Sequence, residues 1–111
     1  ECYSACARIF LGGKSRMLAP GATLGFHRPW IVKESEKRFY EANRIKEKWE
    51  EEFDYVPWIY DVAIGDVVES ITFLRSRGVE MDFILKIYST SSYDIWYPSK
   101  AELLEAGVLT E

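Results

Sequence analysis

Glycine and proline residues divide the N-terminal part of the chain into short apolar pieces. Gly12-Gly13 follows the run ACARIFL at 5–11, Pro20-Gly21 precedes the run ATLGFH at 22–27, and Pro29 comes soon after it. Glycine favours turn conformations and proline lacks a backbone donor, so both interrupt regular elements. We therefore expect a short buried element over 5–11, either helix or strand, and a short buried strand over 22–27.

The middle of the chain carries the spacing of amphipathic helices. Apolar residues at three- and four-residue steps predict a helix over 34–54, which Pro57 ends. A second helix is expected over about 58–77, with Gly78 just beyond its end. The dense charges of the first helix are typical of a solvated face, and a lid or an oligomer contact is the alternative.

Four aromatic residues gather around the proline break, namely Trp49, Tyr55, Trp58 and Tyr60. We expect them to pack into a core, with the anchoring of an interface as the alternative.

The C-terminal part predicts two more helices. One covers about 81–88, and a last one opens at Ser99, because a glutamate three residues later, Glu102, completes a capping box. Gly107 is expected to close that helix, and Val108-Leu109 to form an edge strand. The predicted fold class is α/β and mostly helical, with short strands that need partners.

Composition excludes several classes of protein. The 111 residues are 48% hydrophobic and carry a net charge of −4 with acids and bases interspersed, which excludes disorder and predicts no nucleic-acid partner. No run of 18 apolar residues occurs, so we predict no transmembrane segment. The chain begins with glutamate rather than methionine, and we expect it to be a piece whose N-terminal part is missing.

One serine and one histidine stand out as a candidate reactive pair. Ser4 lies at the start of the apolar run 5–11, and His27, the chain's only histidine, ends the predicted strand. If the run is a helix, unpaired backbone N–H groups lie beside Ser4, where they can stabilise negative charge on a substrate oxygen. A plain helix cap for Ser4 and a core or surface histidine at 27 are the alternatives.

A resemblance to a known family rests on these residues. "CYSACARIFLGG", then Arg16, then "APGATLGFHRP" resemble the nucleophile–histidine segment of the Clp protease proteolytic subunit and its crotonase-like relatives, and most of all bacterial periplasmic Clp-protease-like proteins. "YPSKAELLEAGVL" resembles their C-terminal segment. The middle of the chain, about 33–80, matches less.

The resemblance implies a fold and a set of roles. It implies a stacked βαβ spiral whose N-terminal strands are missing, with 1–111 as the single C-terminal part of a Clp-protease-like domain. It implies Ser4 as nucleophile, His27 as general base and the N–H of Ala5 as one oxyanion donor. Asp94 is the nearest candidate for the acid, about one residue from the expected position. The second oxyanion donor would lie upstream of the chain, and no cofactor or metal is implied.

The function that follows is hydrolysis of an acyl bond, with a peptide or protein as substrate. Assembly into a homo-oligomer and a periplasmic or otherwise extracytoplasmic location are further implications of the resemblance. The alternative is an inactive domain of the same fold that binds a peptide or protein. An Asp94 carboxylate that faces solvent or lies far from His27 favours this alternative. A crotonase-type acyl-CoA enzyme is a third hypothesis, against which the Ser–His pair argues.

The cysteines that flank the serine leave three alternatives open. Cys2 and Cys6 could hold zinc together with His27, although such a site needs a fourth ligand. They could form a disulfide in an oxidising compartment, or remain buried thiols. Either could also be a reactive thiol at a helix N-terminus.

Overall fold

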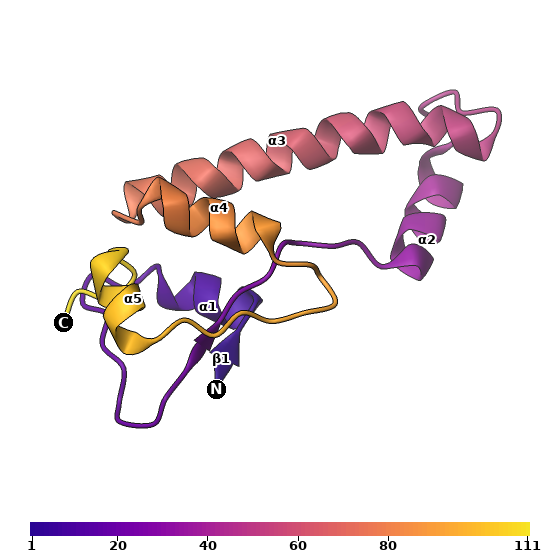
Figure 1. Cartoon of the computed structure of the whole chain (residues 1–111). Coiled ribbons are helices and arrows are strands. Elements are labelled where there is room, and N and C mark those ends of the chain that lie inside the picture. The colour runs from indigo at the N-terminus through magenta and orange to yellow at the C-terminus, as the bar shows by residue number, and fades with distance from the viewer. The chain divides into compact units, whose positions relative to one another are not determined.

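The computed structural model describes all 111 residues. Their contacts group into two compact units: unit 1 consists of Glu1–Pro29 and Ile71–Glu111, and unit 2 of Trp30–Ser70. One junction lies between Pro29 and Trp30, and the other falls within the long helix α3 (Tyr55–Ser76). About half of the residues are helical (Figure 1). The single domain expected over 1–111 stays a prediction.

Unit 1 begins with a strand, a helix and a second strand. Strand β1 (Cys2–Tyr3) is followed directly by α1 (Ala5–Phe10), so the run at 5–11 is a helix. Strand β2 (Leu24–Gly25) pairs with β1 in parallel, with Tyr3 opposite Gly25 (Figure 1). A strand therefore lies within the expected range 22–27, but it is only two residues long. Phe26 does not pair with β1 and instead forms an isolated antiparallel bridge with Trp96.

The expected Clp-protease/crotonase βαβ spiral is wrong for this structure. The two-residue strands β1 and β2 form the only sheet, and helices make up most of the regular structure. The expected edge strand at Val108-Leu109 is also absent. Both residues are buried. The Val108 carbonyl accepts a hydrogen bond from the Arg16 side chain, and the N–H groups of Val108 and Leu109 donate to the Leu103 carbonyl in α5 rather than to a neighbouring strand. The fold is therefore helix-rich, with one small βαβ unit.

The two C-terminal helices agree with their local signals. Helix α4 spans Met81–Ser89 and α5 spans Lys100–Glu105. The backbone N–H of Glu102 donates to Ser99 Oγ at 3.2 Å, and the N–H of Ser99 donates to the Glu102 carboxylate at 2.6 Å, which confirms the capping box. Gly107 follows α5 with φ 76°, a left-handed conformation that favours glycine.

The first predicted helix ends much earlier than expected. Helix α2 spans Lys33–Asn43, not 34–54. The Asn43 side chain donates to the Phe39 carbonyl at 2.9 Å, and Lys48 adopts φ 62°, which no α-helix contains. A short 3₁₀ helix, η1 (Glu52–Asp54), then leads into α3. The chain turns back here because the aromatic side chains on both sides of the turn pack against each other.

Helix α3 begins at Tyr55, two residues before Pro57, whereas the sequence predicted a start just after this proline. Pro57 lies in the first turn, where a missing backbone N–H breaks no intrahelical hydrogen bond. The helix ends at Ser76, and Gly78 with φ 84° follows, as predicted.

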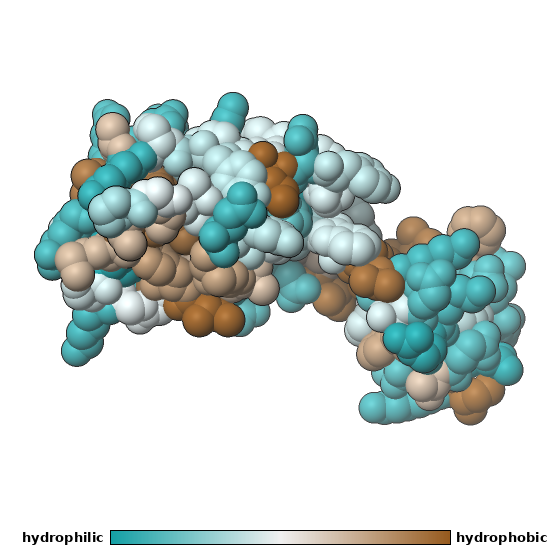
Figure 2. Space-filling model, turned by 90° about the horizontal axis from the view of Figure 1, so that it is seen from below, coloured by the Kyte–Doolittle hydropathy of each residue, from teal (hydrophilic) through white to brown (hydrophobic).

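Hydrophobic and hydrophilic residues are interspersed on the surface drawn in Figure 2. No helix has both the length and the apolar character needed to span a bilayer.

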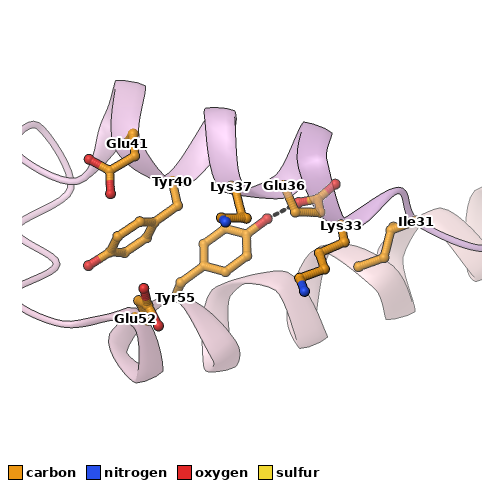
Figure 3. A pocket seen from close by; sticks show the side chains of 8 residues that line it. All are labelled: Ile31, Lys33, Glu36, Lys37, Tyr40, Glu41, Glu52 and Tyr55. Carbon is orange, nitrogen blue, oxygen red and sulfur yellow. Dashed lines mark hydrogen bonds between the residues drawn. The ribbon is translucent and has the colours of Figure 1, made fainter.

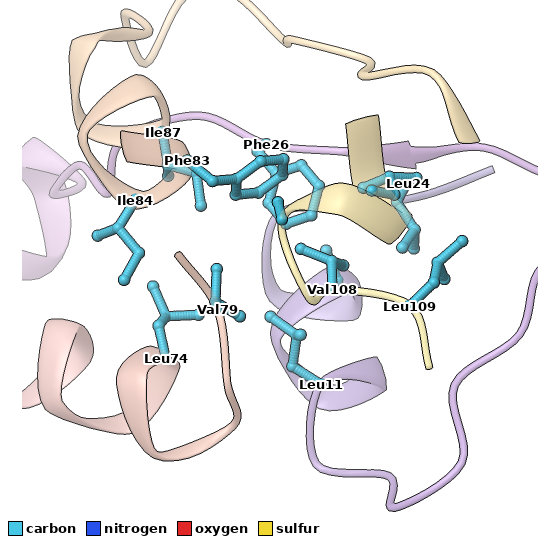
Figure 4. Close-up of a cluster of buried hydrophobic side chains, with 13 residues drawn as sticks. Leu11, Leu24, Phe26, Leu74, Val79, Phe83, Ile84, Ile87, Val108 and Leu109 are labelled. Atoms are coloured by element: carbon cyan, nitrogen blue, oxygen red, sulfur yellow. The ribbon is translucent and has the colours of Figure 1, made fainter. Parts of the chain in front are cut away.

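The core of unit 1 joins α1, β2, α4, α5 and the end of α3 (Figure 4). Leu11 and Leu24 are 1% exposed, and Ile84 and Val108 are fully buried. Phe26 meets Phe83 edge to face, with ring centroids 5.2 Å apart. The remaining members include Ala7, Leu74, Val79, Ile87, Leu103, Ala106 and Leu109.

Arg16 is a charged residue inside this unit, with an exposed fraction of 5%. Its guanidinium donates to four backbone carbonyls: Nε to Val108 at 2.7 Å, Nη1 to Gly13 at 2.9 Å, and Nη2 to Arg77 and Gly107 at 2.9 Å each. Arg77 and Gly107 follow the ends of α3 and α5, where unpaired carbonyls attract a cation. Burial, and then the charge of Arg77, lower the pKa of Arg16.

Replacing this guanidinium should destabilise unit 1. We expect Arg16→Met to lower the free energy of unfolding by about 3 kcal/mol or more, because several buried carbonyls lose a charge-assisted donor. The measurement is urea unfolding followed by circular dichroism. Lys14→Met, at a neighbouring exposed position, is the control and should change stability little. Equal losses in the two variants would contradict the role given to Arg16.

Unit 2 is organised by an aromatic cluster. Tyr40 stacks on Trp49 with ring centroids 6.0 Å apart, Phe39 stacks on Trp58 at 5.0 Å, and Tyr55 meets Trp49 edge to face at 5.1 Å. Packing is therefore confirmed for three of the four aromatic residues expected around the proline break. Tyr60, the fourth, is 69% exposed, and its packing was predicted wrongly.

A hydrogen bond links α2 to the start of α3 within unit 2. The Tyr55 hydroxyl donates to the Glu36 carboxylate. Burial, this hydrogen bond and the negative charge of Glu36 raise the pKa of Tyr55 from 10.0 to about 12.

This raised pKa makes stability depend on alkaline pH. Between pH 10.0 and about 12 the folded state holds the Tyr55 proton and the unfolded state does not, so stability falls as pH rises through this window. We expect Tyr55→Phe to remove that part of the fall, measured by urea unfolding across the window. Tyr93→Phe, at a fully exposed position, should leave the fall unchanged. A pH dependence identical in all three proteins would contradict the assignment.

Candidate functional site

Ser4 forms the turn between β1 and α1. Its backbone has φ 55° and ψ −121°, a combination that only glycine adopts without strain. The turn is held by two hydrogen bonds, since the Ser4 N–H donates to the Gly25 carbonyl at 3.1 Å and the Ser4 carbonyl accepts from the Arg8 N–H at 3.2 Å. The hydroxyl makes no capping hydrogen bond, so the plain helix cap does not account for this serine. Ser4 is exposed to solvent.

A disulfide brackets the serine. Cys2 on β1 and Cys6 on α1 are joined, with their Cα atoms 5.3 Å apart. The bond resolves the three alternatives, because both sulfurs are used and neither can ligate zinc or react as a thiol. No group of three or more His, Cys, Asp or Glu side chains is placed to hold a metal ion. The covalent ring ties the strand to the helix on either side of Ser4.

Gly25 makes room for this turn. A Cβ atom at Gly25 would lie 2.7 Å from Ile95 Cγ2, 2.7 Å from Tyr97 Cε1 and 2.9 Å from Tyr3 Cβ, all closer than real contacts. Only glycine therefore lets β2 lie against both β1 and the segment around Trp96. No role was expected for Gly25 from the sequence, although a glycine inside a short buried strand is a known sign of close backbone approach.

His27 follows β2 by two residues and is half-buried. Its Nδ1 lies 2.7 Å from the carbonyl oxygen of Arg28. In the tautomer that makes this hydrogen bond, Nδ1 carries the proton and Nε2 is left as the proton acceptor. Arg28 is itself anchored to the end of α4, since its N–H and Nε donate to the Thr90 carbonyl at 3.0 and 3.2 Å.

The parallel register brings Ser4 and His27 to the same end of the sheet. Ser4 follows β1, and His27 follows β2 by two residues, so both lie beyond the carboxyl ends of adjacent strands. Residues at such ends commonly form the functional sites of parallel sheets. No hydrogen bond joins the two side chains in this structure. Catalytic hydrogen bonds are often long or poorly aligned before substrate binds.

The other two expected site residues, Ala5 and Asp94, are both exposed. Ala5 is the first residue of α1 and is exposed, and the N–H groups of a first helical turn have no intrahelical partner. Asp94 is exposed in a turn closed by its own N–H and the Ser91 carbonyl at 3.0 Å. Its carboxylate makes neither a hydrogen bond nor an ion pair with His27. The roles given to Ala5 and Asp94 stay predictions.

Comparisons with known proteins add no family to this geometry. No protein-family model, curated protein or solved structure matches the chain significantly. The resemblance to Clp-protease-like proteins stays a prediction from the quoted motifs. What the site can do is therefore inferred from its residues.

The strained backbone at Ser4 can be measured. We expect Ser4→Gly to raise the free energy of unfolding by about 1 kcal/mol, because relief of the positive φ outweighs the greater freedom of glycine in the unfolded chain. Ser15→Gly is the matched control at an exposed serine with ordinary φ, and it should lower stability slightly. Urea unfolding of both variants provides the comparison. A Ser4→Gly variant that loses as much as Ser15→Gly would refute strain at this turn.

Proposed function

We propose that the chain is a serine hydrolase that cleaves acyl bonds, with peptides as its substrate class. Ser4 is the nucleophile, and His27 is the general base. The observation that carries the proposal is the strained Ser4 turn between a strand and a helix, next to a parallel strand that leads to His27.

The Ser4 turn supports nucleophilic attack for a geometric reason. A sharp strand-to-helix turn at a serine, with its unusual backbone angles, presents the hydroxyl at the surface and the following N–H groups beside it. Here the hydroxyl of Ser4 caps nothing and the next N–H belongs to Ala5. Backbone strain of this kind persists only where the surroundings impose it, and it clusters at active sites. At Ser4, this strained backbone is held by the Cys2–Cys6 disulfide and by the hydrogen bond from the Ser4 N–H to the Gly25 carbonyl.

The hydrogen bond at Nδ1 of His27 supports its role as the general base. A catalytic histidine needs its Nδ1 proton held so that Nε2 faces the nucleophile. Here the Arg28 carbonyl accepts the hydrogen bond from Nδ1–H, which a carboxylate accepts in a complete triad. A neutral carbonyl orients the ring but stabilises the imidazolium less than a charged group. We therefore expect a slower enzyme than one with a complete triad.

The proposed reaction has two stages. Ser4 Oγ attacks the carbonyl carbon while its proton passes to His27 Nε2, and the Ala5 N–H donates to the developing oxyanion. The tetrahedral intermediate collapses, the C–N bond breaks, and the amine leaves with the proton from Nε2. Water then loses a proton to Nε2 and attacks the acyl-enzyme. The C–Oγ bond breaks, and Ser4 regains its proton.

One observation favours a second candidate function. The Asp94 carboxylate faces solvent, as an inactive domain that binds a peptide or protein would allow. In that case Ser4 and His27 serve the packing of the β1–α1–β2 unit and no acyl-enzyme forms.

A fluorophosphonate probe distinguishes the two functions. We expect one covalent adduct per chain, on Ser4, measured by intact mass and peptide mapping. Ser4→Ala should abolish the adduct, and His27→Ala should slow its formation by about a hundredfold or more, because the base is lost. Ser15→Ala, which removes another exposed serine, should label at the native rate.

Circular dichroism of each variant shows whether it is folded. Absence of labelling in the folded native chain, or equal labelling of Ser4→Ala, would reject the hydrolase and favour the binding domain.

A further inference from the structure

Unit 2 contains a hollow between α2 and the start of α3. Its volume is about 550 Å³, and Figure 3 shows the side chains that surround it. The lining residues are Ile31, Lys33, Glu36, Lys37, Tyr40, Glu41, Glu52 and Tyr55. All eight belong to unit 2, so the hollow is complete within that unit.

Tyr40 is a buried residue in this lining whose polar atom has no partner. The residue is 9% exposed, and its ring is stacked on Trp49. Its hydroxyl makes no hydrogen bond within the protein, in contrast to that of Tyr55, which donates to Glu36. No fully enclosed side-chain polar atom lacks a partner, so the Tyr40 hydroxyl retains access to solvent. It can therefore meet a group that enters from outside.

Carboxylates surround this hydroxyl. Glu41 and Glu52 line the hollow at the Tyr40 end, and Figure 3 shows their carboxyl groups on the same side as the hydroxyl. The pKa of Tyr40 is raised, mainly because burial disfavours the ionised form. The negative charges of Glu41 and Glu52 raise this pKa further, and the positive charge of Arg44 lowers it. Arg44 is paired with Glu41 at 3.4 Å.

The acidic character continues beyond the hollow. An adjoining hollow of about 390 Å³ shares Tyr40, Glu41 and Glu52 and adds Glu50 and Glu51, together with Arg44 and Phe53. The lysines of the first hollow extend from the N-terminal half of α2, and Figure 3 shows Lys33 at the far end from Glu41 and Glu52, with Lys37 between them. A negative group at the Tyr40 end would therefore be repelled, and a positive one attracted.

We propose that this hollow binds the cationic side chain of an arginine or lysine from a peptide. The N–H groups of such a side chain can donate to Tyr40 Oη and to the Glu52 carboxylate. Its aliphatic part can lie along the rings of Tyr40 and Tyr55, as cations and their stems do on aromatic faces. An arginine satisfies the arrangement best, because its planar donors can reach two acceptors at once.

This site is independent of the proposed chemistry at Ser4. It lies within unit 2, whereas Ser4 and His27 lie in unit 1. The recognition of a basic residue would hold for a peptide that is cleaved and for one that is only bound.

The test is a titration with N-acetyl-arginine amide, followed by the backbone amide signals of the ¹⁵N-labelled chain. N-acetyl-citrulline amide is the matched neutral probe, with the same shape and no charge. We expect saturable shifts at Tyr40, Glu41 and Glu52 with the arginine probe, and binding that weakens as salt concentration rises.

Two variants remove the proposed contacts, and two control variants leave them in place. Tyr40→Phe keeps the stacked ring and loses only the hydroxyl, and Glu52→Gln loses only the charge. Each should weaken binding by about three- to tenfold. Tyr60→Phe and Glu34→Gln make the same changes at exposed positions outside the lining and should leave affinity unchanged.

Several results would overturn the proposal. They are the absence of saturable shifts, equal binding of the citrulline probe, and affinity that is unchanged in both Tyr40→Phe and Glu52→Gln. Shifts confined to residues outside the hollow would overturn it as well. The amide spectrum of each variant shows whether unit 2 is still folded, so loss of binding through unfolding is recognised directly.

Discussion

The buried guanidinium of Arg16 is the interaction on which unit 1 depends. It joins the turn after α1, the end of α3 and the segment after α5, three places far apart in the sequence. A charge with an exposed fraction of 5% is tolerated because backbone carbonyls at helix ends accept its hydrogen bonds. Arg77 supports the same turn, with Nε donating to the Leu11 carbonyl at 2.8 Å. The guanidinium groups of Arg16 and Arg77 thus satisfy backbone carbonyls of segments that no sheet connects.

The candidate site lies at the start of α1, whereas the hydrogen bonds of Arg16 and Arg77 hold the turn after its end. Leu11 at the end of α1 is buried in the core, and the start of the helix is tied to β1 by the Cys2–Cys6 disulfide. Ser4 lies between the two bridged cysteines, where the chain must turn sharply, and Gly25 lets the neighbouring strand approach closely enough to hold this turn. The strain at the serine is therefore maintained by covalent and packing constraints on both sides.

Unit 2 uses tyrosine in two different ways. Tyr55 satisfies its hydroxyl within the fold by donating to Glu36, which connects α2 to α3. Tyr40 stacks its ring in the same aromatic cluster but leaves its hydroxyl unpaired among carboxylates. The first arrangement stabilises the unit. The second leaves an acceptor beside negative charge, which is the chemistry that a basic side chain requires.

The sequence by itself determined the elements whose signals are local. The capping box of Ser99 and the left-handed glycines after α3 and α5 act within one helical turn, so they predict helix ends without any knowledge of the fold. Only the tertiary structure decided that α2 stops at Asn43, that no spiral of strands forms, and that Asp94 faces solvent while Arg28 supports His27. Several contacts that hold this fold together join residues distant in sequence, such as Arg16 and Val108, which are 92 residues apart. Pairings across such separations depend on how the whole chain packs, and no local pattern encodes them.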